Sequence, residues 1–427
     1  MKKRDILYLL VIMLLIYAFS NMVFNSGHVS YKDLDESMAE FVNESTDDSS
    51  PYAFDEYYSE EIGEGWVYTD EEVIQTGSEP VINARSAIVM DFETGTILYE
   101  KNAYRKRPMA STTKIMTAII AFENSSLDED VLISPKAAGM GGSVMGLKAN
   151  TVVKMRDLLH GLLICSGNDA AVAIAEHIGG TVEDFCELMN RKALEIGAFS
   201  TSFSNPHGLD AENHYTTAYD LAKITRYALR IPEFNEIIRK PEFYFNGRTL
   251  KNTNEMLTHY EGADGVKTGY TGLAGRCLVT SATRNNMRLI SVVLFCDTKD
   301  LRTSSSRKIL DYSFSEYSPV ELLRKGGVLG KINVERSRTS QEILVGAAEN
   351  LKAVLKNNEK DTLYTRISIP KKVTAPVKKG TIMGTISIYK NDSILAETSL
   401  IALNSAERKV LSDYINQVVN EWVHSIR

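Results

Sequence analysis

Hydrophobic and polar residues alternate with two different periods along this chain, and each period predicts a different kind of element. Residues 86–102 and 275–297 are short apolar runs broken by turn residues, which predicts two pairs of strands, the second turning at residues 285–286. Between these runs, apolar residues recur at helical spacing, so helices are expected from 113 to about 234. Strands at both ends with helices between them predict an α/β (α+β) domain over residues 84–317, whose sheet joins early and late parts of the segment.

The pattern changes twice more towards the C-terminus. A helix is expected at 302–317, and residues 318–404 then read as short alternating strands separated by Pro, Gly and Asn-Asp turns, which predicts a small all-β domain. Residues 405–427 return to helical spacing with one broad apolar face, and we expect an amphipathic helix there. Its polar face is not rich in Lys and Arg, so membrane, the β domain and a second copy of the chain all remain candidate partners.

The N-terminus carries an export pattern. Residues 1–5 are basic and form a cytoplasmic tip, and residues 6–24 are an apolar run that serves either as a retained signal anchor or as a cleaved signal peptide. Residues 25–83 are polar and strongly acidic, which predicts a disordered tether. This acidic excess of about 15 charges leaves the main body mildly basic, although the net charge of the whole chain is −7.

The four cysteines show no spacing typical of metal ligands. We expect free thiols in the core, because a chain of this size does not need disulfides even after export. One pair, Cys277 and Cys296, lies on neighbouring predicted strands and is the best candidate for a bridge. The other two are Cys165 and Cys186.

Three short polar motifs follow one another within the α/β domain. They are Ser111-x-x-Lys114, Ser166-x-Asn168 and Lys267-Thr268-Gly269. A second Ser-x-x-Lys match at 305–308 comes after the other two motifs, and we interpret it as a chance match. Each motif alone is weak, but the ordered set is specific for penicillin-recognising serine enzymes.

The residue types in these motifs suit nucleophilic catalysis. Ser111 and Lys114 share one helix face, so the amine can take the serine proton if its pKa is lowered by burial and by the nearby charge of Lys267. Ser166 can relay that proton to a leaving amine, and Asn168 can hold a substrate amide. Lys267 and Thr268 suit a substrate carboxylate, and Gly269 would let the substrate backbone lie against the strand.

Longer stretches extend the likeness beyond these motifs. They run from "MASTTKIMTA" through "SGNDAAVAIAEHIGG", "NPHGLDAENHYTTAYDLA" and "DGVKTGYTGLAGRCLVTSAT" to "IPKKVTAPVKKGTIMGTISI". Residues 84–427 therefore resemble low-molecular-mass penicillin-binding proteins of the serine D-alanyl-D-alanine carboxypeptidase family (peptidase S11-like). The resemblance implies a penicillin-binding/β-lactamase-like transpeptidase domain, a β-rich C-terminal domain and a membrane-associating helix. It also implies an oxyanion hole from the backbone N–H groups of Ser111 and Tyr270, and Arg302 as a ligand of the substrate carboxylate.

The function expected from this resemblance is removal of the terminal D-Ala from peptidoglycan stem pentapeptides through an acyl-enzyme on Ser111. β-Lactam antibiotics would be inhibitors, and no metal, cofactor or nucleic acid is expected to take part. The protein would act at the outer face of the bacterial cytoplasmic membrane, and its oligomeric state stays open. A β-lactamase, a D,D-endopeptidase and a catalytically idle penicillin-binding scaffold are the alternatives.

Two other features admit a different interpretation. His207 invites a Ser-His-Asp triad, but the chain lacks a Gly-x-Ser-x-Gly elbow, so we favour a structural histidine at the edge of the site. The glycine-rich loop at 137–150 could cradle a phosphate, but no Lys-Ser/Thr follows it. We interpret this loop as a rim of the active site.

Overall fold

The computed structural model describes residues 79–358 and 363–425. The expected tip and anchor, and the tether up to residue 78, lie outside the described residues.

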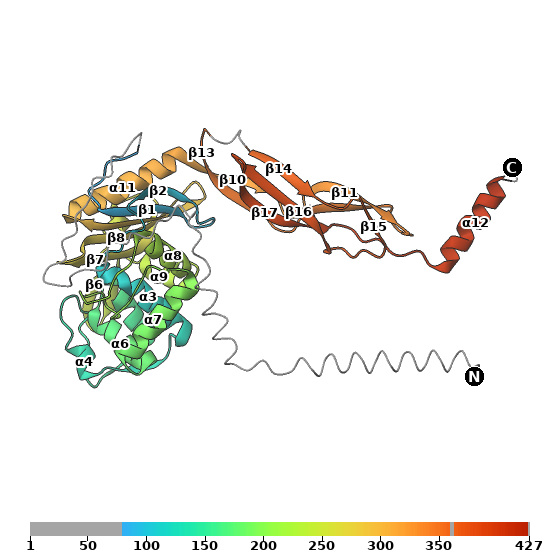
Figure 1. Cartoon of the computed structure of the whole chain (residues 1–427). Helices are drawn as coiled ribbons and strands as arrows, with labels where there is room; N and C mark the ends of the chain where they lie inside the picture. Colours follow the sequence, from blue (N-terminus) through green and yellow to red (C-terminus); the bar gives the residue numbers. More distant parts are fainter. Residues whose placement is uncertain (1–78, 359–362, 426–427) are drawn as a thin grey trace, which may run out of the picture. The chain divides into compact units, whose positions relative to one another are not determined.

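A five-stranded antiparallel sheet forms the centre of the first domain, and both ends of the segment contribute to it (Figure 1). Its strands lie in the order β2-β1-β9-β8-β7. Their bounds are β1 Ser86–Asp91, β2 Ile97–Lys101, β7 Ala263–Thr271, β8 Gly275–Arg284 and β9 Met287–Cys296. As expected, early and late strands pair, because β1 lies antiparallel to β9. The predicted turn at 285–286 joins β8 to β9, and both of its asparagines adopt the positive φ that a two-residue hairpin turn requires.

Helices cover both faces of this sheet, as Figure 1 shows. In β1, Ile88 and Met90 pack into the core beneath the helical layer, whereas Ala87 and Val89 pack beneath α11 on the opposite face. Burial on both faces explains why this strand is an almost unbroken apolar run. The helical layer consists of α3 (Lys114–Asn124), α5 (Met155–Ile164), α6 (Asn168–Gly179), α7 (Val182–Ile196), α8 (Ala218–Ala228) and α9 (Pro232–Ile238).

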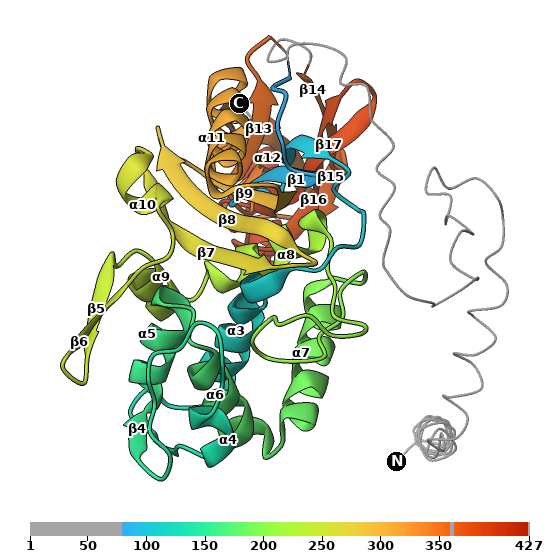
Figure 2. The same ribbon diagram turned by 90° about the vertical axis from the view of Figure 1, so that its left-hand side faces the viewer.

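Short elements connect these layers. Two small hairpins were not predicted from the sequence. The hairpin of β3 and β4 lies within the region that was expected to be helical, and the hairpin of β5 and β6 follows that region and projects beside α5 (Figure 2). The short elements are η1 (Ala110–Thr113), β3 (Asp130–Leu132), α4 (Pro135–Ala138), β4 (Val152–Lys154), β5 (Glu242–Phe245), β6 (Arg248–Lys251) and α10 (Met256–His259).

The helix α11 (Lys299–Glu316) begins three residues before the expected start. Thr298 accounts for the earlier start, because its side chain accepts a hydrogen bond from the backbone N–H of Leu301 and so caps the helix. Arg302 consequently lies in the first turn of α11, close to the edge strand β7, instead of at the helix terminus.

Residues after α11 form the expected all-β domain with a core of its own. A six-stranded sheet has the order β14-β16-β17-β12-β11-β15, and β10 pairs separately with β13. Residues such as Ile343, Val345 and Leu400 are buried in its core. The strands are β10 (Tyr317–Leu323), β11 (Val328–Glu335), β12 (Glu342–Ala347), β13 (Leu351–Lys356), β14 (Leu363–Ser368), β15 (Lys372–Thr374), β16 (Ile382–Lys390) and β17 (Ser393–Ala402).

The C-terminal helix, α12 (Leu411–Ser425), is shorter than expected. Residues 405–410 are not helical, because Ala406 and Lys409 form backbone hydrogen bonds to Val377 and Arg336 of the β domain instead. Apolar side chains are exposed along α12, among them Leu411, Ile415, Val418 and Trp422. Within residues 79–358 and 363–425, no helix is long and apolar enough to cross a bilayer.

Candidate active site

The serine of the first motif lies in a 3-10 turn, η1, and not in the α-helix that was expected. Lys114 opens α3 directly after it, and its Nζ lies 3.0 Å from Ser111 Oγ. A 3-10 turn has three residues per turn, so side chains three positions apart are eclipsed. The local geometry therefore aims the amine at the hydroxyl even more directly than an α-helix would.

Lys114 is fully buried, and its neighbours favour the neutral amine. Nζ lies 2.7 Å from Asn168 Oδ1 and 2.6 Å from the backbone oxygen of His207, both of which are uncharged. Burial holds the pKa of Lys114 well below its ordinary value, and the nearby charge of Lys267 lowers this pKa further. A neutral amine beside a serine hydroxyl can remove the hydroxyl proton, as a general base must.

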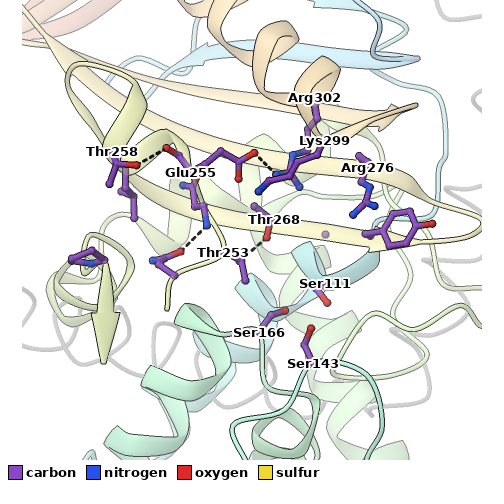
Figure 3. Close-up of a pocket in the computed structure, with 16 residues that line it drawn as sticks. Ser111, Ser143, Ser166, Thr253, Glu255, Thr258, Thr268, Arg276, Lys299 and Arg302 are labelled. Carbon is purple, nitrogen blue, oxygen red and sulfur yellow. Dashed lines mark hydrogen bonds and ion pairs between the residues drawn. The ribbon is translucent and has the colours of Figure 1, made fainter. Parts of the chain in front are cut away.

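Ser166 lies in the sharp turn between α5 and α6, with a positive φ of 65°. Its Oγ is buried and has no hydrogen-bond partner among the residues that the structure describes. Figure 3 shows its side chain near that of Ser111, at the edge of one pocket. Buried hydroxyls without partners are rare, and this one is placed to exchange a proton with a bound substrate.

Asn168 begins α6 and uses both ends of its side-chain amide within the protein. Its Oδ1 accepts from Lys114, and its Nδ2 donates to the backbone oxygen of Gly141 at 2.8 Å. The amide therefore connects the general-base candidate to the loop at 139–150. Sequence reasoning assigned this side chain to the substrate and did not foresee the two internal bonds.

The loop at 139–150 is held over the site by Asp169, which sequence reasoning missed. The Asp169 carboxylate accepts backbone N–H bonds from Met145, Gly146 and Leu147 at 2.9, 2.8 and 3.0 Å. These bonds bring Ser143 to the wall of the same pocket (Figure 3). The loop thus forms a rim of the site, as expected, but its place depends on a buried carboxylate.

The third motif lies on the edge strand β7, whose backbone packs directly against η1, the turn that holds Ser111. A Cβ on Gly269 would lie 2.9 Å from Ala110 Cβ, closer than real Cβ atoms approach, and 3.0 Å from Ser111 N, which is also unusually close. The glycine therefore allows β7 to approach η1, which differs from the expected role of making room for the substrate. Tyr270 follows Gly269 on this strand and lines the same pocket as Ser111.

The two polar residues before Gly269 differ in their surroundings. Lys267 is fully buried, and burial together with the charge of Arg302 lowers its pKa to about 7. The hydroxyl of Thr268 lies at the pocket wall, 2.6 Å from the hydroxyl of Thr253.

Arg302 reaches the same pocket from α11 and is 3% exposed. Its Nη2 lies 2.5 Å from Oε1 of Glu255, which also accepts a hydrogen bond from the hydroxyl of Thr303. Glu255 lies in the turn between β6 and α10, and no pattern in the sequence distinguishes it from an ordinary surface glutamate. Sequence reasoning therefore missed it.

The pocket itself has a volume of about 590 Å³ and opens beside Ser111 (Figure 3). Polar residues from η1, the α5–α6 turn, β7, β8 and α11 converge on it. The structure thus brings all three motifs and Arg302 to one site, although they are spread over almost 200 residues of sequence.

Comparison with known proteins agrees with this arrangement. Residues 73–298 match the family model described as D-alanyl-D-alanine carboxypeptidase, and residues 317–408 match the C-terminal domain of penicillin-binding protein 5. The chain belongs to the D-alanyl-D-alanine carboxypeptidase family.

Individual members of this family align over most of their length. D-alanyl-D-alanine carboxypeptidase DacF of Bacillus subtilis is 34% identical over 356 residues, which cover 81% of this chain and 91% of that protein. DacC of Escherichia coli is 34% identical over 369 residues, or 82% and 92% of the two chains. The crystal structure of penicillin-binding protein 5 from Haemophilus influenzae, 32% identical, gives a TM-score of 0.69 over 78% of this chain and 100% of that chain. The expected fold class is therefore confirmed.

His207 and the cysteines have structural roles in this D-alanyl-D-alanine carboxypeptidase family member. The backbone oxygen of His207 contacts Lys114, and burial lowers the pKa of its ring to about 3, so the imidazole stays neutral. All four cysteines are free, and three are buried. The candidate bridge between Cys277 and Cys296 is therefore absent, and the expectation of free thiols is confirmed.

Proposed function

We propose that this protein is a serine-type D-alanyl-D-alanine carboxypeptidase that removes the terminal D-Ala from peptidoglycan stem pentapeptides. The observation that carries the proposal is the buried amine of Lys114, which lies 3.0 Å from Ser111 Oγ with no carboxylate among its hydrogen-bond partners. An amine so placed is neutral when it meets substrate, and it can activate the serine without a histidine.

Acylation follows from the positions of the polar groups. Ser111 Oγ attacks the carbonyl carbon of the penultimate D-Ala while Lys114 takes its proton. The N–H groups of Ser111 and Tyr270 stabilise the resulting oxyanion. Ser166 then gives its proton to the amine of the terminal D-Ala and takes the proton that Lys114 carries; the C–N bond breaks, free D-Ala leaves, and Lys114 is neutral again.

Deacylation reverses the proton movements with water as the nucleophile. Water attacks the ester on Ser111 and gives a proton to Lys114, which passes it to Ser111 Oγ as the ester C–O bond breaks and the shortened peptide leaves with a new carboxyl group. Lys267, Thr268 and Arg302 bind the carboxylate of the uncleaved substrate, because paired cations and a hydroxyl select a free C-terminus. Asn168 holds the substrate amide with the second N–H of Nδ2 and the second lone pair of Oδ1, which its internal bonds leave available. β-Lactam antibiotics acylate the same serine and act as inhibitors.

The cellular site of action belongs to the same proposal. The apolar run at 6–24 would hold the enzyme at the outer face of the bacterial cytoplasmic membrane, or direct its export before cleavage. N-terminal sequencing of the mature protein distinguishes the two cases, because cleavage would leave a chain that begins near Asn21.

Labelling with fluorescent penicillin and hydrolysis of a pentapeptide test the catalytic proposal together. The wild-type protein should bind the label covalently and release one D-Ala per peptide, as read by mass spectrometry. Ser111→Ala should lose both activities. Ser305→Ala is the matched control, because it removes the serine of the chance motif and should keep the label; a labelled Ser111→Ala protein would overturn the assignment.

A further inference from the structure

A stacked tyrosine and arginine form part of the pocket wall, and the reaction above uses neither of their side chains. Tyr270 and Arg276 are direct partners on the neighbouring strands β7 and β8. The guanidinium carbon of Arg276 lies 3.6 Å from the centre of the Tyr270 ring, and both side chains line the pocket beside Ser111 (Figure 3). Such a stack fixes the plane of the guanidinium and leaves its N–H edges free.

Arg276 has no acidic partner among the residues that the structure describes. No ion pair or hydrogen bond of its side chain occurs within residues 79–358 and 363–425. Asp210, on the loop near this end of β7, instead accepts a hydrogen bond from the hydroxyl of Thr271 at 2.6 Å. The half-buried guanidinium thus stands ready for an anion that the protein does not supply.

The charges that line the pocket lead to the same conclusion. Three cationic side chains, Arg276, Lys299 and Arg302, face a single carboxylate, that of Glu255. Glu255 is already paired with Arg302. Two positive charges, those of Arg276 and Lys299, therefore remain without a carboxylate in the pocket lining. Of these two side chains, Arg276 is the one that stacks on an aromatic ring, which fixes its position.

The position of Arg276 on β8, directly beside Tyr270 of β7, identifies the part of the substrate that it would meet. In the proposed function, Thr268 and Arg302 hold the terminal carboxylate, and the N–H of Tyr270 meets the reacting carbonyl. The peptide before that carbonyl must then continue past Tyr270, on the side away from Thr268. Figure 3 shows Arg276 on one side of Thr268 and Glu255 on the other.

We propose that Arg276, oriented by Tyr270, binds a side-chain carboxylate on the residue that precedes D-Ala-D-Ala in the stem peptide. This subsite rests on the proposed function, and it makes the enzyme selective for stem peptides whose third residue carries a free acid. A planar guanidinium is suited to this ligand, because its parallel N–H groups match the two oxygens of a carboxylate.

A pair of synthetic peptides tests the subsite. Both are acetyl-diaminopimelyl-D-Ala-D-Ala, and the side-chain carboxylate of the diamino acid is free in one and amidated in the other. The wild-type enzyme should favour the free acid by about tenfold in kcat/KM, since a charge-assisted hydrogen bond is worth at least that factor. Arg276→Gln should lose this preference by slowing only the free-acid peptide, mainly through a higher KM.

Lys299→Gln is the matched control, because it removes a neighbouring cation of the pocket wall without touching the stack. This variant should keep the preference for the free acid. Equal slowing of both peptides by Arg276→Gln, an unchanged preference, or an equal loss in Lys299→Gln would each overturn the proposal. The last result would mean that the general field of the pocket, and not Arg276 itself, selects the acid.

Protection of Ser111 from fluorescent penicillin by each peptide provides a second measurement that needs no turnover. The free-acid peptide should protect the wild-type protein at about tenfold lower concentration than the amide. In Arg276→Gln, the two peptides should protect at the same concentration. A protein that releases no D-Ala would refute the proposed function, whereas equal protection by both peptides would refute the subsite.

Discussion

Glu255 and Arg302 form a nearly buried ion pair at the carboxylate end of the pocket, with 2.5 Å between Oε1 and Nη2. A buried guanidinium without a partner would be costly, and the glutamate removes much of that cost. Because Thr303 also donates to Glu255, the carboxylate is itself fixed in place. The pair orients Arg302 before any substrate arrives, which reduces the entropy lost on binding.

Arg302→Ala should discriminate between substrates with and without a free C-terminus. Hydrogen bonds to charged groups contribute roughly 1.5–3 kcal/mol, so kcat/KM for a peptide ending in free D-Ala should fall about 10–150-fold. The same peptide with an amidated C-terminus should be nearly unaffected, because it has no carboxylate to lose. Steady-state kinetics on the two peptides measures this difference, and equal slowing of both would show that Arg302 is purely structural.

Glu255→Ala should act through Arg302 alone. Without its partner the guanidinium loses its fixed orientation, and kcat/KM for the free-acid peptide should fall by about tenfold. The double variant Glu255→Ala/Arg302→Ala should be no slower than Arg302→Ala, because residues that work through one contact are not additive. Additive losses in the double-mutant cycle would assign Glu255 an effect of its own on the reaction.

The two buried lysines predict a shift in pH dependence. Acylation needs neutral Lys114, so its rate should rise with pH as Lys114 loses its proton. The charge of Lys267, whose own pKa is lowered to about 7, helps to keep the pKa of Lys114 low. Lys267→Gln removes this charge, which raises the pKa of Lys114 and should move the acid limb of the penicillin acylation profile to higher pH.

Lys267→Arg is the control for this experiment, since it keeps a positive charge at the same place. Its acid limb should stay near that of the wild type even if the absolute rate falls. An acid limb that does not move in Lys267→Gln would show that burial alone sets the pKa of Lys114, or that another group is the base.

Asp169→Asn should loosen the loop that carries Ser143. The asparagine keeps one acceptor oxygen, so at least one of the N–H groups of Met145, Gly146 and Leu147 loses its partner. The free energy of unfolding in urea should fall by roughly 2–4 kcal/mol, and penicillin acylation should slow as well. Asp184→Asn, at an exposed position of α7, should change neither quantity appreciably. An equal effect there would mean that the loss at Asp169 is not specific to the loop.

Much of this fold could be predicted from local patterns. The turn at residues 285–286, the helical layer and the all-β domain all follow from the local spacing of apolar residues and from turn-forming residues. Spacing alone also placed Lys114 beside Ser111, because side chains three positions apart lie on the same face of an α-helix or a 3-10 helix. The sequence by itself therefore determined the main elements, their order and the proximity of Ser111 and Lys114, but not the two small hairpins or the 3-10 turn.

Contacts between distant segments decided the rest. The bonds from Lys114 to His207, from Asp169 to Met145 and from Arg302 to Glu255 join residues 93, 24 and 47 positions apart. No local period encodes such contacts, because they depend on how separately formed elements pack and on which buried polar groups must find a partner. For the same reason, the sequence did not show that Gly269 faces the turn that holds Ser111. It also did not show that the last helix begins after residue 410, because Ala406 and Lys409 form backbone hydrogen bonds with the β domain. The tertiary structure alone sets the surroundings of Ser111 and Lys114 that come from distant parts of the chain.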